Sequence, residues 1–227
     1  RHRPLRAPSP RQRGARHAIA IAPQPTNYLM EKPEYALSYN RDQGRPNWVC
    51  WHLSDEWVGT LTRVATFRAH PAVPADWYRV QSFDFQFSGF DRGHMVPNAD
   101  RDGQIAINQA TYLMSNMIAE APDNNQGPWA NLENHLRSLT EAGDEIYVVS
   151  GPVGVGGTGS EGFAATIANG HVTVPAYTWK ARLVLPKDSG DDASRVTCAS
   201  RTIAVIMPNV QGIRNDPWEN YLTTVDA

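Results

Sequence analysis

Ser88-Gly89-Phe90-Asp91-Arg92-Gly93-His94-Met95-Val96-Pro97 is the stretch of this chain that is densest in side chains able to do chemistry. A histidine can take a proton from water near neutral pH, and an arginine can bind a phosphate through two parallel hydrogen bonds. A glycine between them lets another segment approach the backbone closely. Taken alone, a histidine is more often structural than catalytic, so His94 needs partners from other segments to form a site.

A second polar segment follows about thirty residues later, where Asp123-Asn124-Asn125 precedes Trp129 and Leu132-Glu133. Amide and carboxylate oxygens in small number, with water filling the other positions, suit Mg²⁺. Asparagine-rich segments also form good turns, and that is the simpler interpretation when this segment is considered alone.

Apolar spacing predicts a helix over residues 129–142 that ends at Gly143, and a shorter helix is predicted over residues 104–113. Glu133 and Arg137 lie four residues apart on the longer helix, which favours an exposed salt bridge as the simplest explanation of the pair. The residues that recur at helical spacing are Trp129, Leu132, Leu136 and Leu139.

Strand-like segments lie on both sides of this helical part. Residues 35–39 and 47–53 are rich in aromatic and β-branched side chains and flank turn-forming residues, which predicts a hairpin. Some of the later segments are continuously apolar, as in central strands. These later segments are residues 145–150, 171–174, 178–185 and 202–207.

Charge is distributed unevenly over the 227 residues, whose net charge is −2. Six arginines precede the first acidic residue, Glu31, and the other 15 basic and 23 acidic side chains give the rest of the chain a charge of −8. We expect residues 1–26, rich in arginine and proline, to be a disordered leader and residues 27–227 to form one domain. An acidic body argues against a general nucleic-acid binder, and no apolar run approaches the length of a membrane helix.

Two cysteines, Cys50 and Cys198, are too few for a disulfide scaffold or a structural zinc site. One disulfide bridge and two buried thiols are both compatible with their spacing.

The chain resembles the DNA/RNA non-specific endonuclease family, the ββα-metal nucleases that include endonuclease G, and is most similar to the bacterial secreted sugar-non-specific nucleases. The likeness begins near Tyr28 and extends to Val225-Asp226. It implies an α+β fold in which helices flank a central antiparallel sheet and residues 94–137 form the ββα-metal core. The motifs that carry it are Asp91-Arg92-Gly93-His94, Asp123-Asn124-Asn125, Trp129, Leu132-Glu133, Arg137, Val174-Pro175 and Trp179-Lys180.

The resemblance implies specific roles for three residues. His94 would be the general base that deprotonates the attacking water. Asn125 would be the one direct protein ligand of a hydrated Mg²⁺, with Mn²⁺ or another divalent ion able to substitute. Glu133 would hold the same ion through water.

Five further residues have implied roles around this centre. Arg63, Arg92 and Arg137 would approach the phosphodiester, whereas Asp91 would be mainly structural and Asn116 would support the metal site. One face of the helix would then serve metal and phosphate together, so the salt-bridge interpretation of Glu133 and Arg137 becomes the weaker one.

The implied function is Mg²⁺-dependent cleavage of DNA and RNA that leaves 5′-phosphate ends. The expected partners are nucleic acids and a protein inhibitor, with no membrane, in a monomer or homodimer that is secreted or periplasmic. Two alternatives stay open: a weak or silent nucleic-acid-binding relative, and a metal-dependent phosphodiesterase of small substrates. Relatives commonly have Pro-Gln where this chain has Ala119-Glu120, and the added carboxylate could weaken substrate affinity or shift metal preference.

Overall fold

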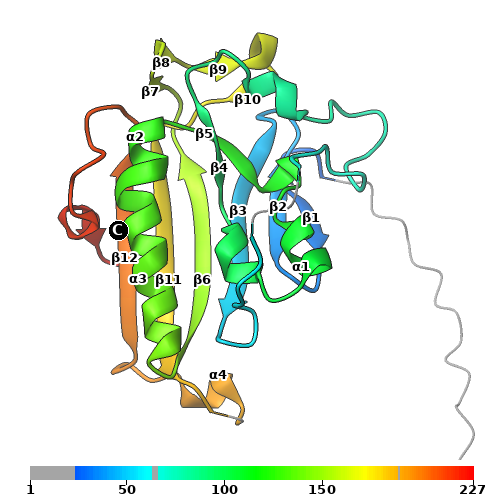
Figure 1. Ribbon diagram of the computed structural model, residues 1–227. Helices are drawn as coiled ribbons and strands as arrows, with labels where there is room; N and C mark the ends of the chain where they lie inside the picture. Colours follow the sequence, from blue (N-terminus) through cyan, green and yellow to red (C-terminus); the bar gives the residue numbers. More distant parts are fainter. Residues whose placement is uncertain (1–23, 63–65, 189) are drawn as a thin grey trace, which may run out of the picture.

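The computed structural model describes residues 24–62, 66–188 and 190–227 (Figure 1). Most of the predicted leader, residues 1–23, and the predicted site residue Arg63 therefore lie outside the described residues. The last residues of that predicted leader are attached to the domain. The carbonyl oxygen of Pro25 accepts a hydrogen bond from the backbone of Arg41 (2.7 Å), and that of Thr26 accepts one from the Asn47 side chain (2.8 Å).

The centre of the fold is a seven-stranded antiparallel sheet in the order β1-β2-β3-β6-β11-β12-β13. Its existence confirms the predicted α+β class, and β2 and β3 form the predicted hairpin. The four longest strands contain the segments predicted at 47–53, 145–150, 178–185 and 202–207. The strands are β1 (Tyr28–Glu31), β2 (Ala36–Asn40), β3 (Arg45–Leu53), β6 (Asp144–Val153), β11 (Tyr177–Pro186), β12 (Arg201–Pro208) and β13 (Leu222–Thr223).

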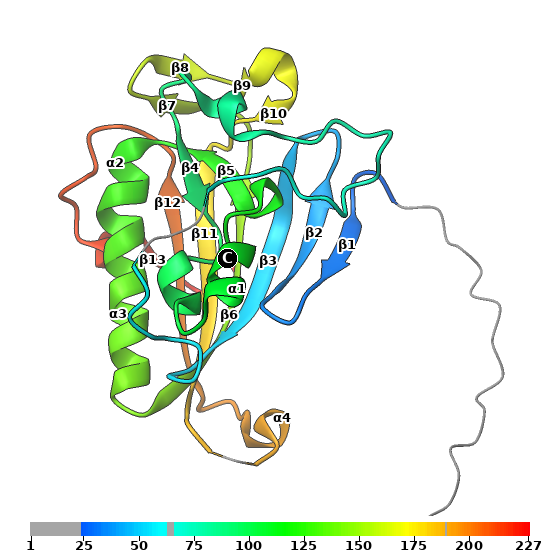
Figure 2. The same cartoon turned by 45° about the vertical axis from the view of Figure 1, so that its right-hand side comes forward.

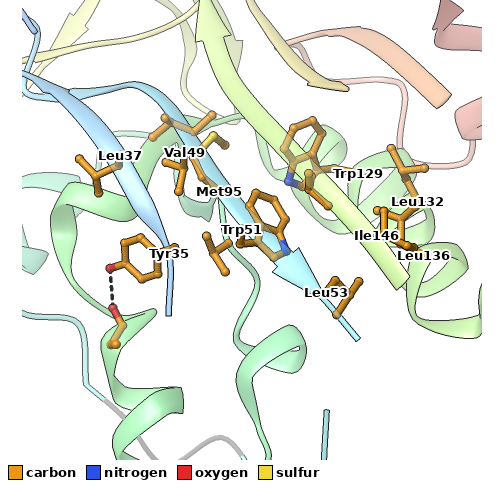
Figure 3. Close-up of a cluster of buried hydrophobic side chains, with 14 of the residues drawn as sticks. Tyr35, Leu37, Val49, Trp51, Leu53, Met95, Trp129, Leu132, Leu136 and Ile146 are labelled. Atoms are coloured by element: carbon orange, nitrogen blue, oxygen red, sulfur yellow. Dashed lines mark hydrogen bonds between the residues drawn. The ribbon is translucent and has the colours of Figure 1, made fainter. Parts of the chain in front are cut away.

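Helix α3 (Ala130–Glu141) covers one face of the sheet and confirms the predicted long helix (Figures 1 and 2). Its buried side chains Leu132 and Leu136 belong to the same core cluster as Trp51 on β3 and Ile146 on β6 (Figure 3). Alternation places Trp51 inward and its neighbours in the sequence outward, so one face of the sheet supplies the core.

The predicted helix over 104–113 is shorter than expected. Helix α1 spans only Ile105–Ala110, and the Tyr35 hydroxyl donates a hydrogen bond to the carbonyl oxygen of Ala110 (2.7 Å; Figure 3). The next residues leave the helix because Leu113 forms a β-bridge with Arg68. Short 3₁₀ segments η2 (Asn98–Arg101) and η3 (Met114–Asn116) lie on either side of α1 in the sequence.

A two-stranded ribbon and the following helices form the predicted ββα unit. β4 (Asp91–His94) pairs antiparallel with β5 (Met117–Glu120), so the unit begins three residues before His94. The chain then passes through α2 (Pro122–Asn124) and the π-type turn η4 (Asn125–Trp129) into α3.

Small elements occupy the two ends of the sheet. At one end lie the 3₁₀ helix η1 (Ser82–Phe85), the hairpin β7 (Gly157–Gly159) and β8 (Gly162–Ala164), η5 (Ala168–Gly170), and β9 (Thr166–Ile167) paired with β10 (Val172–Thr173). The strand predicted over 171–174 is thus a short edge piece outside the central sheet. Helix α4 (Asp192–Arg195) lies at the opposite end, and η6 (Trp218–Tyr221) precedes β13 (Figure 1).

Two remaining predictions concern the cysteines and the membrane. Both cysteines are free: Cys50 is half-buried on β3, whereas Cys198 is exposed, so neither the bridge nor a pair of buried thiols is found. Within the described part of the chain, no helix combines the length and apolar character needed to cross a bilayer.

Candidate active site

The strand pairing of β4 with β5 determines which predicted site residues lie opposite each other and on which face of the ribbon. Asp91 lies opposite Glu120, and His94 lies opposite Met117. Because side chains alternate along a strand, Asp91 points to one face of the ribbon and His94 to the other. The indole nitrogen of Trp129 donates a hydrogen bond to the carbonyl oxygen of His94 (3.4 Å), which attaches the start of α3 to β4.

A hollow of about 290 Å³ lies at the end of the ribbon and brings together three of the predicted residues, Asp91, Arg92 and Asn125. Phe67 and Gln126 complete its lining. The Arg92 guanidinium lies 5.3 Å from the centre of the Phe67 ring. A cation held in this way is available to an anion that enters the hollow.

The amide of Asn125 is oriented by Asp91. Its Nδ2 donates to Asp91 Oδ2 (2.8 Å), and Gln126 Nε2 donates to the same oxygen (2.7 Å). None of the described residues donates a hydrogen bond to Asn125 Oδ1. An amide oxygen is a preferred ligand of hard divalent cations, so the residues present fit a magnesium-type ion at this position. Asp91, predicted to be mainly structural, orients the Asn125 amide through this hydrogen bond.

His94 is almost completely buried, and its ring packs between two other rings. The ring centres of Phe67 and Tyr112 lie 5.4 Å and 5.2 Å away. Asn116 supports the chain that follows: its Oδ1 accepts from the Val96 backbone (3.0 Å), and its Nδ2 donates to the carbonyl oxygens of Val96 and Thr111. Asn116 therefore holds the backbone beside His94 in place. The resemblance implied that Asn116 supports the metal site, whereas its amide forms hydrogen bonds to the main chain.

Glu133 is held by a lysine inside the sheet. Its Oε1 accepts a hydrogen bond from Lys180 Nζ (3.0 Å) on the central strand β11, and the Lys180 side chain is completely buried. Lys180 Nζ also lies 3.9 Å from the centre of the Trp129 ring. Burial raises the pKa of the Glu133 carboxyl, and the positive charge of Lys180 opposes that shift. A lysine within an apolar strand is the sequence signal that could have identified this partner.

Arg137 pairs with Asp100, a residue to which the sequence analysis assigned no role. Arg137 Nη1 lies 2.7 Å from Asp100 Oδ1, and the indole nitrogen of Trp51 donates to Asp100 Oδ2 (3.0 Å). The exposed salt bridge between Glu133 and Arg137, the simplest explanation of their spacing, is wrong. Each residue has a buried partner elsewhere, and both still lie on the same face of α3.

Glu120, the departure from the family pattern, is completely buried beneath β4. Its Oε1 accepts from Asn124 Nδ2 (3.0 Å), whereas its Oε2 has no hydrogen-bond partner among the described residues. A Cβ atom at Gly93 would lie 2.1 Å from that Oε2. The motif therefore needs glycine here, because the Glu120 side chain approaches the β4 backbone too closely for any other residue. Burial, and secondarily the charge of Glu133, raises the pKa of Glu120 well above its usual value.

Replacing Glu120 with glutamine should therefore stabilise the fold at alkaline pH. The unfolded carboxyl ionises near pH 4.3, whereas the folded one keeps its proton to higher pH. The folded state then binds more protons, so wild-type stability falls as the pH rises above about 4.3 until the folded group also ionises. We expect Glu120→Gln to unfold at a higher temperature than wild type at pH 8, by about 1 kcal/mol in stability, with a smaller gain at pH 4. Thermal melts at both pH values measure this, and an equal or lower melting temperature at pH 8 would contradict it.

One group of three side chains elsewhere in the described residues is a candidate metal site: His52, Glu145 and Asp192. It lies beside α4, at the opposite end of the sheet from β4 and α2 (Figure 1). His52 Nε2 lies 2.9 Å from Glu145, and Arg195 forms ion pairs with both Glu145 and Asp192. Arg195 offsets one of the two negative charges of these carboxylates, so an ion bound here would compete with its guanidinium.

Comparison with known proteins agrees with this geometry. Residues 14–227 match the family model described as DNA/RNA non-specific endonuclease. A nuclease of Nostoc is 43% identical over 202 residues, covering 89% of this chain and 70% of that protein. Human mitochondrial endonuclease G is 29% identical over 205 residues, covering 88% and 66%, and mouse mitochondrial nuclease EXOG is 32% identical over 155 residues, covering 66% and 42%.

The fold is also similar to the solved crystal structure of the EndoG/EndoGI complex, which concerns the mechanism of EndoG inhibition. The TM-score is 0.72 at 26% identity, and the match covers 88% of this chain and 81% of that one. The chain spans about two thirds or less of several of these relatives, because its match covers 66% of human endonuclease G and 42% of mouse EXOG.

Proposed function

The chain belongs to the DNA/RNA non-specific endonuclease family, and on this premise we propose that it hydrolyses phosphodiester bonds in DNA and RNA with one hydrated Mg²⁺ ion. The observation that carries the proposal is the Asp91–Asn125 hydrogen bond, which leaves the Asn125 amide oxygen available in a hollow that also contains Arg92. A ligand oxygen for a cation and a fixed guanidinium for a phosphate are thus side by side.

His94 would take a proton from the attacking water. Its position on β4, two residues after Arg92, brings a proton acceptor next to the residue that would bind the phosphate. The flanking rings of Phe67 and Tyr112 restrict rotation of the imidazole, so the attacking water meets the base in one orientation.

Arg92 and Arg137 would hold the phosphodiester and offset the charge that builds in the transition state. Asp100 keeps the Arg137 guanidinium in one position through a 2.7 Å ion pair. Arg63, outside the described residues, stays a predicted third arginine. Contacts aimed at phosphate carry no base information, which supports cleavage with little sequence preference. The proposed products carry 5′-phosphate ends.

The ion would be held directly by Asn125 Oδ1 and through water by Glu133. When bound, Mg²⁺ would stabilise negative charge on the phosphate and on the leaving oxygen. Lys180 occupies one oxygen of Glu133, and no described residue donates a hydrogen bond to the other, Oε2. Oxygen ligands of this kind also accept Mn²⁺.

The proposal is tested by cleavage of closed circular plasmid DNA and of long RNA. We expect the wild-type protein to cut both in Mg²⁺ and neither in EDTA, with activity falling as salt rises because salt weakens the contacts between the arginines and the phosphates. A phosphodiesterase of small substrates would cut an activated diester and leave circles intact. A silent relative would bind the nucleic acid and cut nothing, and either result would reject the proposal.

We propose in addition that the enzyme is secreted or periplasmic, since such an activity must be kept from the nucleic acid of its own cell. A protein inhibitor is a further proposed partner, supported by the similarity of this chain to EndoG in the solved EndoG/EndoGI complex. The proposed assembly is a monomer or a homodimer.

A further inference from the structure

Three phenylalanine side chains are exposed on the loops beside the hollow. Phe83 in η1 is 61% exposed, Phe87 in the following turn is 99% exposed, and Phe163, the middle residue of β8, is 72% exposed. We call these three side chains the aromatic rim. Large aromatic side chains normally bury most of their surface, so three of them in solvent at one end of the molecule require an explanation.

The aromatic rim is attached to the proposed phosphate site. Arg92 Nε and Nη2 both donate to the carbonyl oxygen of Ser82 (3.0 and 2.8 Å), the residue directly before Phe83. Phe87 precedes Asp91 by four residues, so their Cα atoms are at most about 14 Å apart. In a nucleic-acid strand with a rise of about 3.4 Å per nucleotide, that distance is within about four nucleotides of a phosphate bound in the hollow.

Phe163 belongs to the same surface because its hairpin packs on the loop that carries Phe87. The backbone nitrogen of Ser160 donates to the carbonyl oxygen of Gly89 (2.9 Å), and a Cβ atom at Gly89 would lie 2.6 Å from the backbone nitrogen of Glu161. A hollow of about 460 Å³ lies between residues 83–88 and residues 164–169, which directly follow Phe163. Its lining includes Phe83, Asp84, Ser88, Ala164, Thr166 and Asn169.

The backbone here adopts conformations that side chains disfavour. Across the described residues, the non-glycine positions with positive φ are Phe87 (58°), Ala168 (54°) and Asn169 (54°). Phe87 belongs to the aromatic rim, and the other two line the hollow beside it. A bulky residue in the left-handed region is costly, and such conformations cluster where binding or catalysis requires them. Phe87 thus remains exposed although both the contact of its ring with water and its positive φ are unfavourable.

We propose that unpaired nucleobases of the substrate stack on the aromatic rim while their phosphate is held at Arg92. This inference rests on the proposed nuclease function and specifies its substrate. Exposed aromatic rings stack on the faces of any base without reading sequence. Asp84 follows Phe83 in the sequence and Glu161 lies beside Gly89, so carboxylates accompany the rings and the phosphates are left to the arginines. Base faces are covered in a duplex, and single-stranded DNA or RNA is therefore the preferred substrate.

Binding measured without cleavage tests this proposal. In the His94→Ala background with EDTA, fluorescence anisotropy would compare a single-stranded oligonucleotide with a hairpin duplex of the same sequence. We expect Phe83→Ala and Phe87→Gly each to weaken single-strand binding about tenfold and duplex binding less than twofold. An oligonucleotide that contains 2-aminopurine should be quenched on binding, and the quenching should decrease in both variants.

Two controls separate the aromatic rim from the fold. Phe87→Gly introduces glycine, which adopts the positive φ of this position without steric strain. The melting temperature of the variant should therefore equal or exceed that of the parent protein while its binding weakens. Leu29→Ala removes another exposed apolar side chain, 54% exposed on the edge strand β1, and should leave both affinities unchanged.

Equal loss of single-strand and duplex affinity, or no loss in either phenylalanine variant, would overturn the stacking proposal. So would a concentration-dependent dimer that the same substitutions abolish, because the aromatic rim would then contact a second copy. These results leave plasmid and RNA cleavage by the wild-type protein intact. Failure of that cleavage in Mg²⁺ would instead reject the proposed function on which this inference rests.

Discussion

Replacing His94 with alanine should lower the rate of DNA cleavage by a factor of about 10² or more at saturating substrate and Mg²⁺. The imidazole is the proposed proton acceptor for the attacking water, and alanine offers none. The substitution removes a ring that packs against Phe67 and Tyr112 but leaves the β4 backbone and its pairing with β5 in place. We therefore expect kcat to fall much more than the affinity for nucleic acid, because phosphate binding depends on the arginines.

Initial rates on plasmid DNA, measured beside oligonucleotide affinity, check this expectation. His135→Ala is a matched control, since His135 lies on α3 and stacks on Trp218, away from the ribbon. That variant should cut at the wild-type rate. Cleavage by His94→Ala within a few-fold of wild type would show that another group is the general base.

Replacing Asn125 with alanine should cause the second large loss, and raised Mg²⁺ should partly reverse it. The substitution removes the only proposed direct protein ligand of the ion, so the concentration of Mg²⁺ required for half-maximal activity should rise at least tenfold. It also leaves Asp91 Oδ2 with Gln126 as its remaining partner among the described residues. A Mg²⁺ titration of activity, together with Mn²⁺ binding followed by electron paramagnetic resonance, measures the effect with and without catalysis.

Asn220→Ala is the control for this substitution, because Asn220 is an exposed asparagine in η6 that does not line the hollow containing Asn125. It should not change the Mg²⁺ requirement. An unchanged requirement in Asn125→Ala would place the ion elsewhere, and the His52, Glu145 and Asp192 group beside α4 would then be the first alternative.

The long elements of the fold could be predicted because their side chains follow a regular period. Leu132 and Leu136 recur on one face of a helix, and Trp51 alternates with outward residues along β3. The ribbon that carries His94 has no such pattern. β4 is only four residues long and contains two charged side chains and a glycine, so its strand conformation depends on pairing with β5.

The candidate site likewise contains residues that the motifs indicated and residues that only the structure places there. Motif resemblance pointed to Asp91, Arg92 and Asn125, which the structure brings to one hollow. Lys180 and Asp100 had no assigned role, although each holds a predicted site residue. Lys180 is 47 residues from Glu133, and Asp100 is 37 residues from Arg137, so no local spacing links them.

By itself the sequence determined the family, the α+β class, the long helix and the chemical types available for catalysis, since these depend on composition, motif and period. Only the tertiary structure decided which charges share a buried partner and which aromatic rings remain in solvent. Glu133 and Arg137 are matched by their spacing along the helix, yet each buried charge requires a close partner. Lys180 on β11 pairs with Glu133, and Asp100 in η2 pairs with Arg137. The sequence likewise does not show that three phenylalanines stay in solvent, whereas the structure exposes them on loops near Arg92.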